Sequence, residues 1–297
     1  MLALQNLTKT FGDKVAVDRL NMTVEAGSIM GLIGQNGAGK TTTFRMILDF
    51  IKADTGVITW QQQPITQEVK QRIGFLPEER GLYQKLTIEE QILYFAELHG
   101  MKRTEARAEL LDWMTRLEVI GKISDKVQTL SKGNAQKVQF IATLIHRPEF
   151  LILDEPFTGL DPVNTSLLMA EIKQLRDNGA AIIFSSHNMS GVASLSDQLT
   201  MLKKGKVVLQ GGIYEIRESF GRTHIYVESD VPSAELAAMS GVVSLAPQGQ
   251  GRMIHVSDET VGRDIFKKVS ETGYVQAFVQ APPTLDEIFR QEVAENV

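Results

Sequence analysis

The sequence predicts an α/β protein that carries a second, smaller α+β domain at its C-terminal end. Three observations support this prediction. A glycine-rich turn at residues 34–41 joins an apolar run to an amphipathic segment. A second apolar run, residues 150–153, ends in two carboxylates. From about residue 223 the segments follow the order strand, helix, strand, strand, helix, strand, which is typical of a ferredoxin-like domain.

The composition is that of a soluble globular protein. The chain has 297 residues, of which 43% are hydrophobic and 23% charged, and this length predicts about two domains. A net charge of −5 argues against a nucleic-acid partner, and the lack of cysteine excludes disulfides. No apolar run approaches the roughly 18 residues that span a bilayer, and the start lacks the features of a signal peptide. We therefore expect a cytoplasmic protein whose membrane role requires another chain.

Residues 34–41 match the phosphate-binding pattern G-x-x-x-x-G-K-[ST]. An expected strand at 28–33 precedes them and an expected helix at 42–50 follows, so a turn without a ligand is disfavoured. Glycines let backbone N–H groups face an anion, and the helix N-terminus adds positive charge. Lys40 can reach the phosphates and the Thr41 hydroxyl can ligate Mg²⁺. The expected nucleotide-binding residues here are Gly34, Gln35, Asn36, Gly37, Ala38, Gly39, Lys40, Thr41 and Thr42.

The N-terminal residues predict strands around the phosphate loop. Alternating leucines indicate a strand at 2–7, and further strands are expected at 15–24 and 57–60. Phe11 falls on the expected turn at 9–13, beside the glycine-rich loop. It offers either a face on which adenine stacks or an ordinary core aromatic, and its spacing leaves both open.

The next part of the chain predicts a helical insert at about 82–130. A strand at 71–76 and a polar loop at 77–81 precede it. Thr87 and Glu90 form a capping-box pattern that opens one helix, and apolar residues at 106–117 mark a second. No strand signal occurs within the insert.

Residues 131–210 return to alternating helix and strand. Ser131 is a plausible N-cap of a helix that ends at Pro148. The apolar run 150–153 predicts a buried parallel strand that delivers Asp154 and Glu155 at its carboxyl end. A strand at 180–184 leads to His187, and residues 199–210 predict a hairpin. A last helix is expected to begin at Thr284 with a capping box to Glu287.

Over residues 1–215 the chain resembles the ATP-binding-cassette (ABC) ATPases. Besides the phosphate loop, the matching stretches are Leu130–Asn134 for the signature motif, Leu151–Glu155 for Walker B, Gly159–Pro162 for the D-loop and Ser186–His187 for the switch histidine. The resemblance implies a P-loop core with an antiparallel β subdomain and a helical subdomain. Residues 221–297 are then an accessory ferredoxin-like domain.

The resemblance also implies roles for individual residues. Asp154 is similar to the acid that holds Mg²⁺, Glu155 to the general base that activates water, and His187 to the residue that contacts the γ-phosphate of ATP. Ser131 and Gly133 resemble signature residues that bind the nucleotide of an opposite subunit. Because the chain has one set of motifs, a homodimer or a heterodimer of such subunits is implied.

Three residues depart from the common family pattern. Lys132 and Asn134 replace a glycine and a glutamine of the signature motif, and Glu78 replaces a glutamine that ligates Mg²⁺. Glu78 is expected to ligate Mg²⁺ in turn, or to point to solvent or pair with Arg80. The stretch 76–83 and the Leu-Ser-Lys-Gly-Asn motif resemble ATPase subunits of bacterial ABC-2-type exporters, similar to sodium-exporter ATP-binding proteins.

The implied function is ATP hydrolysis that drives separate transmembrane permease subunits at the inner face of the cell membrane, with sodium or drug export as possible tasks. The alternative is a non-transport ABC ATPase acting on ribosomes or DNA. One cassette, no heptad run and net negative charge speak against that alternative. The C-terminal domain either binds a small regulatory ligand or serves dimerisation or docking, since residues 223–297 show no convincing polar constellation.

Overall fold

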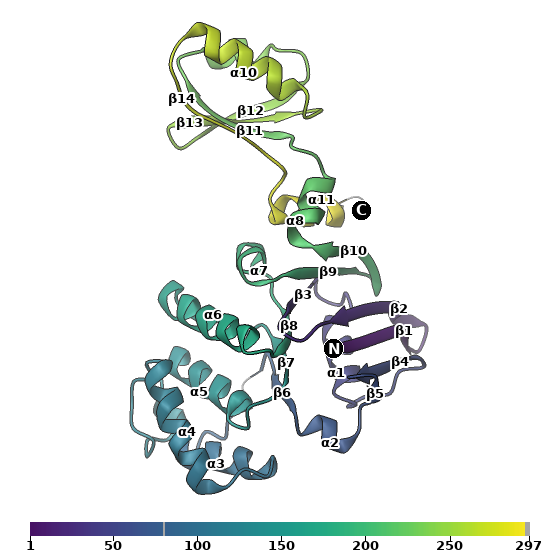
Figure 1. Ribbon diagram of the computed structural model, residues 1–297, viewed down its shortest axis with the longest axis vertical. Helices are drawn as coiled ribbons and strands as arrows, with labels where there is room; N and C mark the ends of the chain where they lie inside the picture. Colours follow the sequence, from purple (N-terminus) through teal and green to yellow (C-terminus); the bar gives the residue numbers. More distant parts are fainter. Residues whose placement is uncertain (80, 295–297) are drawn as a thin grey trace. The chain divides into compact units, whose positions relative to one another are not determined.

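The computed structural model describes residues 1–79 and 81–294. They form two compact units, Met1–Gln210 and Gly211–Val297, which are described separately. Figure 1 shows their helices and strands, with two sheets in the first unit and one in the second.

The first unit contains a six-stranded sheet that positions the acidic residues. Its order is β10-β9-β3-β8-β7-β6, and β6, β7, β8, β3 and β9 run parallel. Every residue of β3, β7 and β8 is buried, as expected for parallel strands covered on both faces. The strands are β3 (Ile29–Ile33), β6 (Ile73–Leu76), β7 (Phe150–Asp154), β8 (Ala181–Ser185), β9 (Gln198–Lys203) and β10 (Lys206–Gly212).

A four-stranded antiparallel sheet of order β2-β1-β4-β5 packs into the same hydrophobic core. Its strands are β1 (Leu2–Phe11), β2 (Lys14–Val24), β4 (Thr55–Trp60) and β5 (Gln63–Pro64). The turn expected at 9–13 is shorter, because β1 continues to Phe11. The reason is that Thr10 and Phe11 still pair with Val15 and Lys14 of β2. The Asp54 carboxylate also accepts hydrogen bonds from the Lys9 side chain and the Thr10 N–H, both at 2.7 Å.

Several helices of the first unit begin at a side-chain cap that the sequence predicts. Thr87 Oγ1 accepts from the Glu90 N–H at 3.1 Å while the Glu90 carboxylate accepts from the Thr87 N–H at 2.8 Å, so the expected capping box is confirmed. Two short helices, α2 and α7, lack a long periodic signal and were not predicted. The helices are α1 (Lys40–Ile47), α2 (Gln67–Lys70), α3 (Ile88–Leu98), α4 (Arg103–Arg116), α5 (Lys132–Leu144), α6 (Pro162–Asp177) and α7 (Met189–Leu195), with a 3₁₀ turn, η1 (Val127–Thr129).

The second unit confirms the ferredoxin-like prediction. Its sheet has the antiparallel order β12-β13-β11-β14, and α10 lies along one face of it (Figure 1). Ile225 and Val227 of β11 share a separate core with Ile265 and Val269 of α10. The elements are α8 (Ile213–Ser219), β11 (His224–Ser229), α9 (Ser233–Ala237), β12 (Val242–Gln248), β13 (Gly251–Val256), α10 (Val261–Thr272), β14 (Val275–Ala281) and α11 (Leu285–Ala294).

Candidate functional site

The carboxyl ends of β3, β7 and β8 border a cavity of about 410 Å³ in the first unit. Parallel strands bring their carboxyl ends to one edge of the sheet, where ligands of α/β proteins bind. Residues from three separate motifs therefore meet in one place. The lining residues are Phe11, Lys14, Ala16, Asn36, Gly37, Gly39, Lys40, Thr41, Thr42, Glu78, Asp154, Glu155 and His187.

The glycine-rich loop between β3 and α1 is a tight cradle. Gly39 caps α1 with φ 114°, and a Cβ there would approach the Ala16 carbonyl oxygen to 2.5 Å. The Lys40 ammonium donates to the carbonyls of Gly34 at 2.7 Å and Gln35 at 3.3 Å. Only glycine adopts this backbone without strain. The loop thus places backbone N–H groups and a buried cation at a helix N-terminus, an arrangement that suits a polyphosphate.

A serine that sequence reasoning missed organises the acidic end of β7. The buried Ser185 hydroxyl donates to Asp154 Oδ1 at 2.5 Å and accepts from the Glu155 N–H at 3.1 Å. Asp154 and Ser185 are partners in the parallel register of β7 and β8. The sequence offers one sign of this role, because Ser185 is a polar residue that ends an otherwise apolar strand. Ser185 therefore orients both acids.

Glu155 has the features of a buried base. Its φ of 52° lies in the left-handed region, which is uncommon for a residue other than glycine and concentrates at functional sites. His187 Nε2 lies 3.3 Å from Glu155 Oε1, yet that oxygen has no hydrogen-bond partner among the residues that the structure describes. Burial raises the pKa of the Glu155 carboxyl, although His187 and Lys40 oppose the rise. A buried carboxyl that lines the cavity beside Lys40 and His187 has the character of a proton acceptor.

The charges around the cavity fit an anion together with a divalent cation. Burial lowers the pKa of Lys40, although Glu155, Asp154 and Glu78 oppose the decrease. Three carboxylates beside one buried lysine leave an excess of hard oxygen ligands, which Mg²⁺ prefers. The residues present therefore fit both nucleotide phosphates and Mg²⁺.

Phe11 lines the cavity and is 51% exposed. The alternative that Phe11 is an ordinary core aromatic is therefore wrong. Lys14 and Ala16 of β2 also line the cavity and were not predicted. They arrive there because β2 folds back on β1 with Phe11 and Lys14 paired. Gly34, Gln35 and Ala38, three predicted nucleotide-binding residues, belong to the loop but not to the lining.

Ser131 and Gly133 lie at the N-terminus of α5 and do not line this cavity. Ser131 caps the helix, as predicted, by accepting from the Asn134 N–H at 3.3 Å. The Asn134 amide accepts from the Ile120 N–H at 3.2 Å and donates to the Ile120 carbonyl at 3.3 Å. Asn134, one of the two residues that depart from the signature motif, thus ties the first turn of α5 to the loop that follows α4.

The loop that carries Glu78 is held by α5. Gln139 Nε2 donates to the carbonyls of Pro77 at 3.1 Å and Glu79 at 3.4 Å. Glu78 itself is exposed to solvent but lines the cavity. The alternative partner, Arg80, lies outside the described residues.

Comparison with known proteins decides the family. Residues 17–158 match the family described as ABC transporter. Residues 211–293 match a family described as ATP-binding protein DrrA1-3-like, C-terminal domain. The chain is 42% identical to the uncharacterized ABC transporter ATP-binding protein YhaQ of Bacillus subtilis, over 99% of this chain and 98% of the relative. This chain belongs to the ABC transporter ATP-binding proteins.

Two further comparisons agree. A Nod factor export ATP-binding protein I of Burkholderia lata is 31% identical over 96% of this chain and 94% of its own length. A solved structure of the ATP-binding subunit of an ABC transporter matches with a TM-score of 0.70 and 28% identity, over 74% of this chain and 93% of that one. As members of this family hydrolyse ATP, the chain is an ATPase. No helix among the described residues is long and apolar enough to cross a membrane.

The ABC ATPase has a second, more apolar cavity of about 450 Å³, lined mainly by α3, α5 and β6 and by the loop after β6. His99 and His146 stack there with ring centroids 3.6 Å apart. The lining residues are Leu48, Phe50, Lys70, Ile73, Phe75, Pro77, Gly81, Leu82, Phe95, Leu98, His99, Gln139, Ala142, Thr143 and His146.

His146 should make the fold of the ABC ATPase sensitive to acid. Burial and the neighbouring His99 lower the pKa of His146 to about 4 from an ordinary value of 6.5. Between these values the unfolded chain binds the proton and the folded chain does not, so the free energy of unfolding decreases as pH falls from 6.5 to about 4. In His146→Gln, where an amide can still donate to the Ile73 carbonyl, urea unfolding should show a smaller decrease over that window. Equal decreases would contradict the assignment to His146.

Glu78→Gln tests the metal site. A neutral amide binds Mg²⁺ less strongly than a carboxylate and repels phosphate less when the metal is absent. We expect tighter ATP binding in EDTA and a higher Mg²⁺ concentration at half-maximal hydrolysis, each by about 2- to 5-fold because exposed charges are well screened. Glu79→Gln, which removes an exposed carboxylate outside the lining, is the matched control. Unchanged values for both measurements in Glu78→Gln would place Glu78 outside the metal site.

Proposed function

We propose that this ABC ATPase is the motor subunit of an exporter and that it drives separate membrane subunits. The observation that carries the proposal is the convergence of Lys40, Asp154, Glu155 and His187 on one cavity. The export task is supported by the Nod factor export relative, which aligns with nearly the whole chain. Sodium or a drug remains the proposed class of cargo.

The proposed chemistry assigns one role to each group. Lys40 and the loop N–H groups hold the phosphates, and Phe11 stacks on the adenine. Thr41, Asp154 and Glu78 hold Mg²⁺, which neutralises phosphate charge when bound. Glu155 accepts the proton of the attacking water, and His187, whose Nε2 lies 3.3 Å from Glu155 Oε1, contacts the γ-phosphate.

We further propose that two such subunits act together, as a homodimer or as a heterodimer with a related chain. Ser131 is exposed and lies away from its own nucleotide cavity, together with Gly133. Both are therefore available to a nucleotide held by a second subunit. The N-terminus of α5 would then bind the γ-phosphate of that nucleotide. Light scattering in the presence of MgATP tests this proposal by measuring the molar mass of the particle. A mass equal to one chain at all protein concentrations would contradict a dimer.

The membrane subunits are proposed to dock in the apolar cavity between α3 and the loop after β6. Leu98 on α3 lines this cavity and is 58% exposed, a side chain that a partner could cover. Apolar surface exposed in a concave site is typical of protein interfaces. This contact would place the chain at the inner face of the cell membrane.

Cross-linking can test the docking surface, because the chain contains no cysteine. Leu98→Cys, labelled at its thiol with a maleimide-benzophenone reagent and mixed with membranes that contain the membrane proteins encoded beside the gene, should form a covalent cross-link to one of them on irradiation. Ile120→Cys is the matched control, since Ile120 is 79% exposed and does not line the cavity. Equal cross-linking by both variants, or a chain that never sediments with membranes, would contradict the proposal.

Residues 1–215 and 221–297 are proposed to act as separate domains. Among the described residues, the hydrophobic cluster that the two sheets of the nucleotide-binding part share extends no further along the chain than Val207, and the cluster of the second unit begins at Ile225. A chain ending at Phe220 should therefore unfold cooperatively and still bind ATP. An insoluble product without ATP binding would show instead that the two parts depend on each other for folding.

A further inference from the structure

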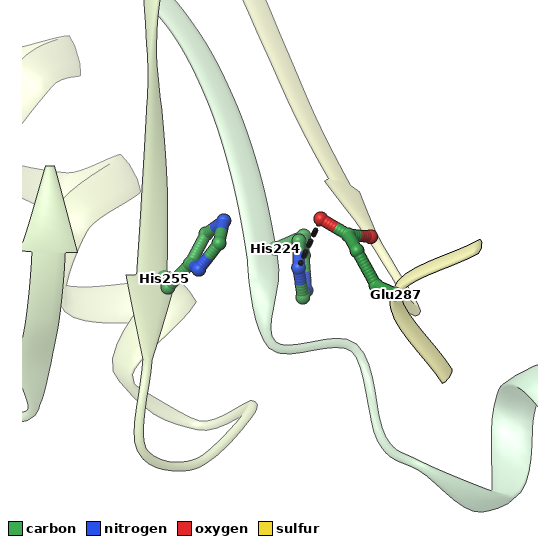
Figure 2. Close-up of side chains that lie close together, drawn as sticks. All are labelled: His224, His255 and Glu287. Atoms are coloured by element: carbon green, nitrogen blue, oxygen red, sulfur yellow. Dashed lines mark ion pairs between the residues drawn. The ribbon is translucent and has the colours of Figure 1, made fainter. Parts of the chain in front are cut away.

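Two histidines and a glutamate converge in the second unit, where sequence analysis found no polar constellation. His224 begins β11, His255 lies on β13, and Glu287 belongs to the first turn of α11 (Figure 2). His224 and His255 are partners in the antiparallel register, so their side chains share one face of the sheet. One ligand atom from each of the three residues lies within 4.8 Å of the other two.

The distances are close to those of a metal site. His224 Nε2 lies 3.2 Å from Glu287 Oε1, and the two imidazole centroids are 4.1 Å apart. With bonds of 2.0–2.1 Å, a tetrahedral Zn²⁺ holds neighbouring ligand atoms about 3.3 Å apart. One pair already has this spacing, and His255 reaches it by a shift of about 1.5 Å or less, which a side-chain rotation supplies.

Outer partners hold two of the three groups in the orientation that a metal requires. Thr223 Oγ1 lies 3.3 Å from His224 Nδ1, which leaves Nε2 directed at Glu287. The N–H and hydroxyl of Thr284 each donate to Glu287 Oε2 at 2.7 Å, which leaves Oε1 directed at His224. Such partners are typical of metal ligands, because they set the tautomer and the ring or carboxylate orientation.

The surrounding charges favour neutral imidazole, the form that binds metals. Burial and the neighbouring His255 and Arg217 lower the pKa of His224, although Glu287 opposes the decrease. The Arg217 guanidinium is engaged elsewhere, since it donates to the carbonyls of Pro283 at 2.9 Å and Pro282 at 3.2 Å. The side chain of His224 is 14% exposed and that of Glu287 40%, so an ion can still enter from solvent.

We propose that His224, His255 and Glu287 bind a divalent transition-metal ion, with Zn²⁺ as the best chemical match. Imidazole ligands favour Zn²⁺ and its neighbours over Mg²⁺ and Ca²⁺, so the site is distinct in chemistry from the nucleotide site. Three protein ligands leave a fourth position for water. The ion joins α11 to β11 and β13, and metal binding therefore fastens the last helix of the chain to its sheet.

The full-length chain, stripped with EDTA and dialysed, tests the site by calorimetric titration with Zn²⁺. Excess Mg²⁺ is included to occupy the oxygen ligands of the nucleotide site. We expect one equivalent of Zn²⁺ for the wild type and an affinity at least 10-fold weaker for His255→Gln and Glu287→Gln. Glutamine also fits the capping box at Thr284, so Glu287→Gln should fold normally. His99→Gln, which alters the stacked histidine pair of the first unit, is the matched control and should bind like the wild type.

Two spectroscopic and thermal measurements separate a metal site from a simple ion pair between His224 and Glu287. Co²⁺ should give the intense visible d–d absorption of a low-coordinate site in the wild type and not in His255→Gln. Zn²⁺ should raise the melting temperature of the wild type but not of that variant. Equal Zn²⁺ affinity in the wild type and in both ligand variants, or no binding by the wild type, would overturn the proposal.

Discussion

Glu155→Gln should bind MgATP with nearly wild-type affinity and lose steady-state hydrolysis by about 10²- to 10⁴-fold, the usual contribution of a general base. The amide keeps the size of the buried side chain but cannot accept the proton of the attacking water. The left-handed backbone at residue 155 stays compatible, since the Ser185 hydroxyl still receives the N–H. Because hydrolysis no longer separates the subunits, we also expect this variant to accumulate as an ATP-bound dimer.

The matched control for this variant lies at the opposite end of the same strand. Glu149 directly precedes β7, is exposed, and pairs with Arg72 at the surface. Glu149→Gln removes the same charge without touching the cavity and should hydrolyse ATP like the wild type. Turnover of Glu155→Gln within a few fold of the wild type, measured as phosphate release, would remove Glu155 from the role of base.

Lys40→Ala should weaken ATP binding by about 10- to 100-fold, the range expected for one charge-assisted hydrogen bond to phosphate. Lys40 is buried and only 8% exposed, so its charge is poorly screened. The same substitution removes the ammonium that ties the carbonyls of Gly34 and Gln35 together. Fluorescent-nucleotide titration in EDTA isolates the phosphate contact from the metal.

Lys14 provides the control for Lys40. It lines the same cavity but is exposed on β2 near Phe11, so water screens its charge. Lys14→Ala should change ATP affinity by no more than a few fold. If Lys14→Ala weakened binding as much as Lys40→Ala, the affinity would depend on the overall charge of the cavity rather than on the loop lysine.

Features that depend on contiguous residues could be predicted from the sequence. The phosphate loop needs only a strand, glycines and a helix start within a short stretch. Both capping boxes, at Thr87 and Thr284, depend on residues three positions apart and occur as expected. The strand and helix order of the second unit follows in the same way from local periodicity.

The parts of the site that were missed depend on register. Ser185 reaches Asp154 because β7 and β8 pair in parallel, across 31 residues of sequence. Lys14 enters the nucleotide cavity because a hairpin returns it beside Phe11. A polar residue at the end of a strand is visible in the sequence, but its neighbour across the sheet is not.

The sequence by itself determined the family, the nucleotide chemistry, and the α/β and ferredoxin-like folds of the two parts. Motifs and periodicity could predict these features because they are local properties of the chain. Only the tertiary structure decided that the Asn134 amide bonds to the Ile120 backbone of its own chain and that His224, His255 and Glu287 meet. These three residues come from two strands and a helix that no short stretch of sequence contains together. The antiparallel register of β11 and β13 and the cap of α11 at Thr284 bring them within reach of one ion.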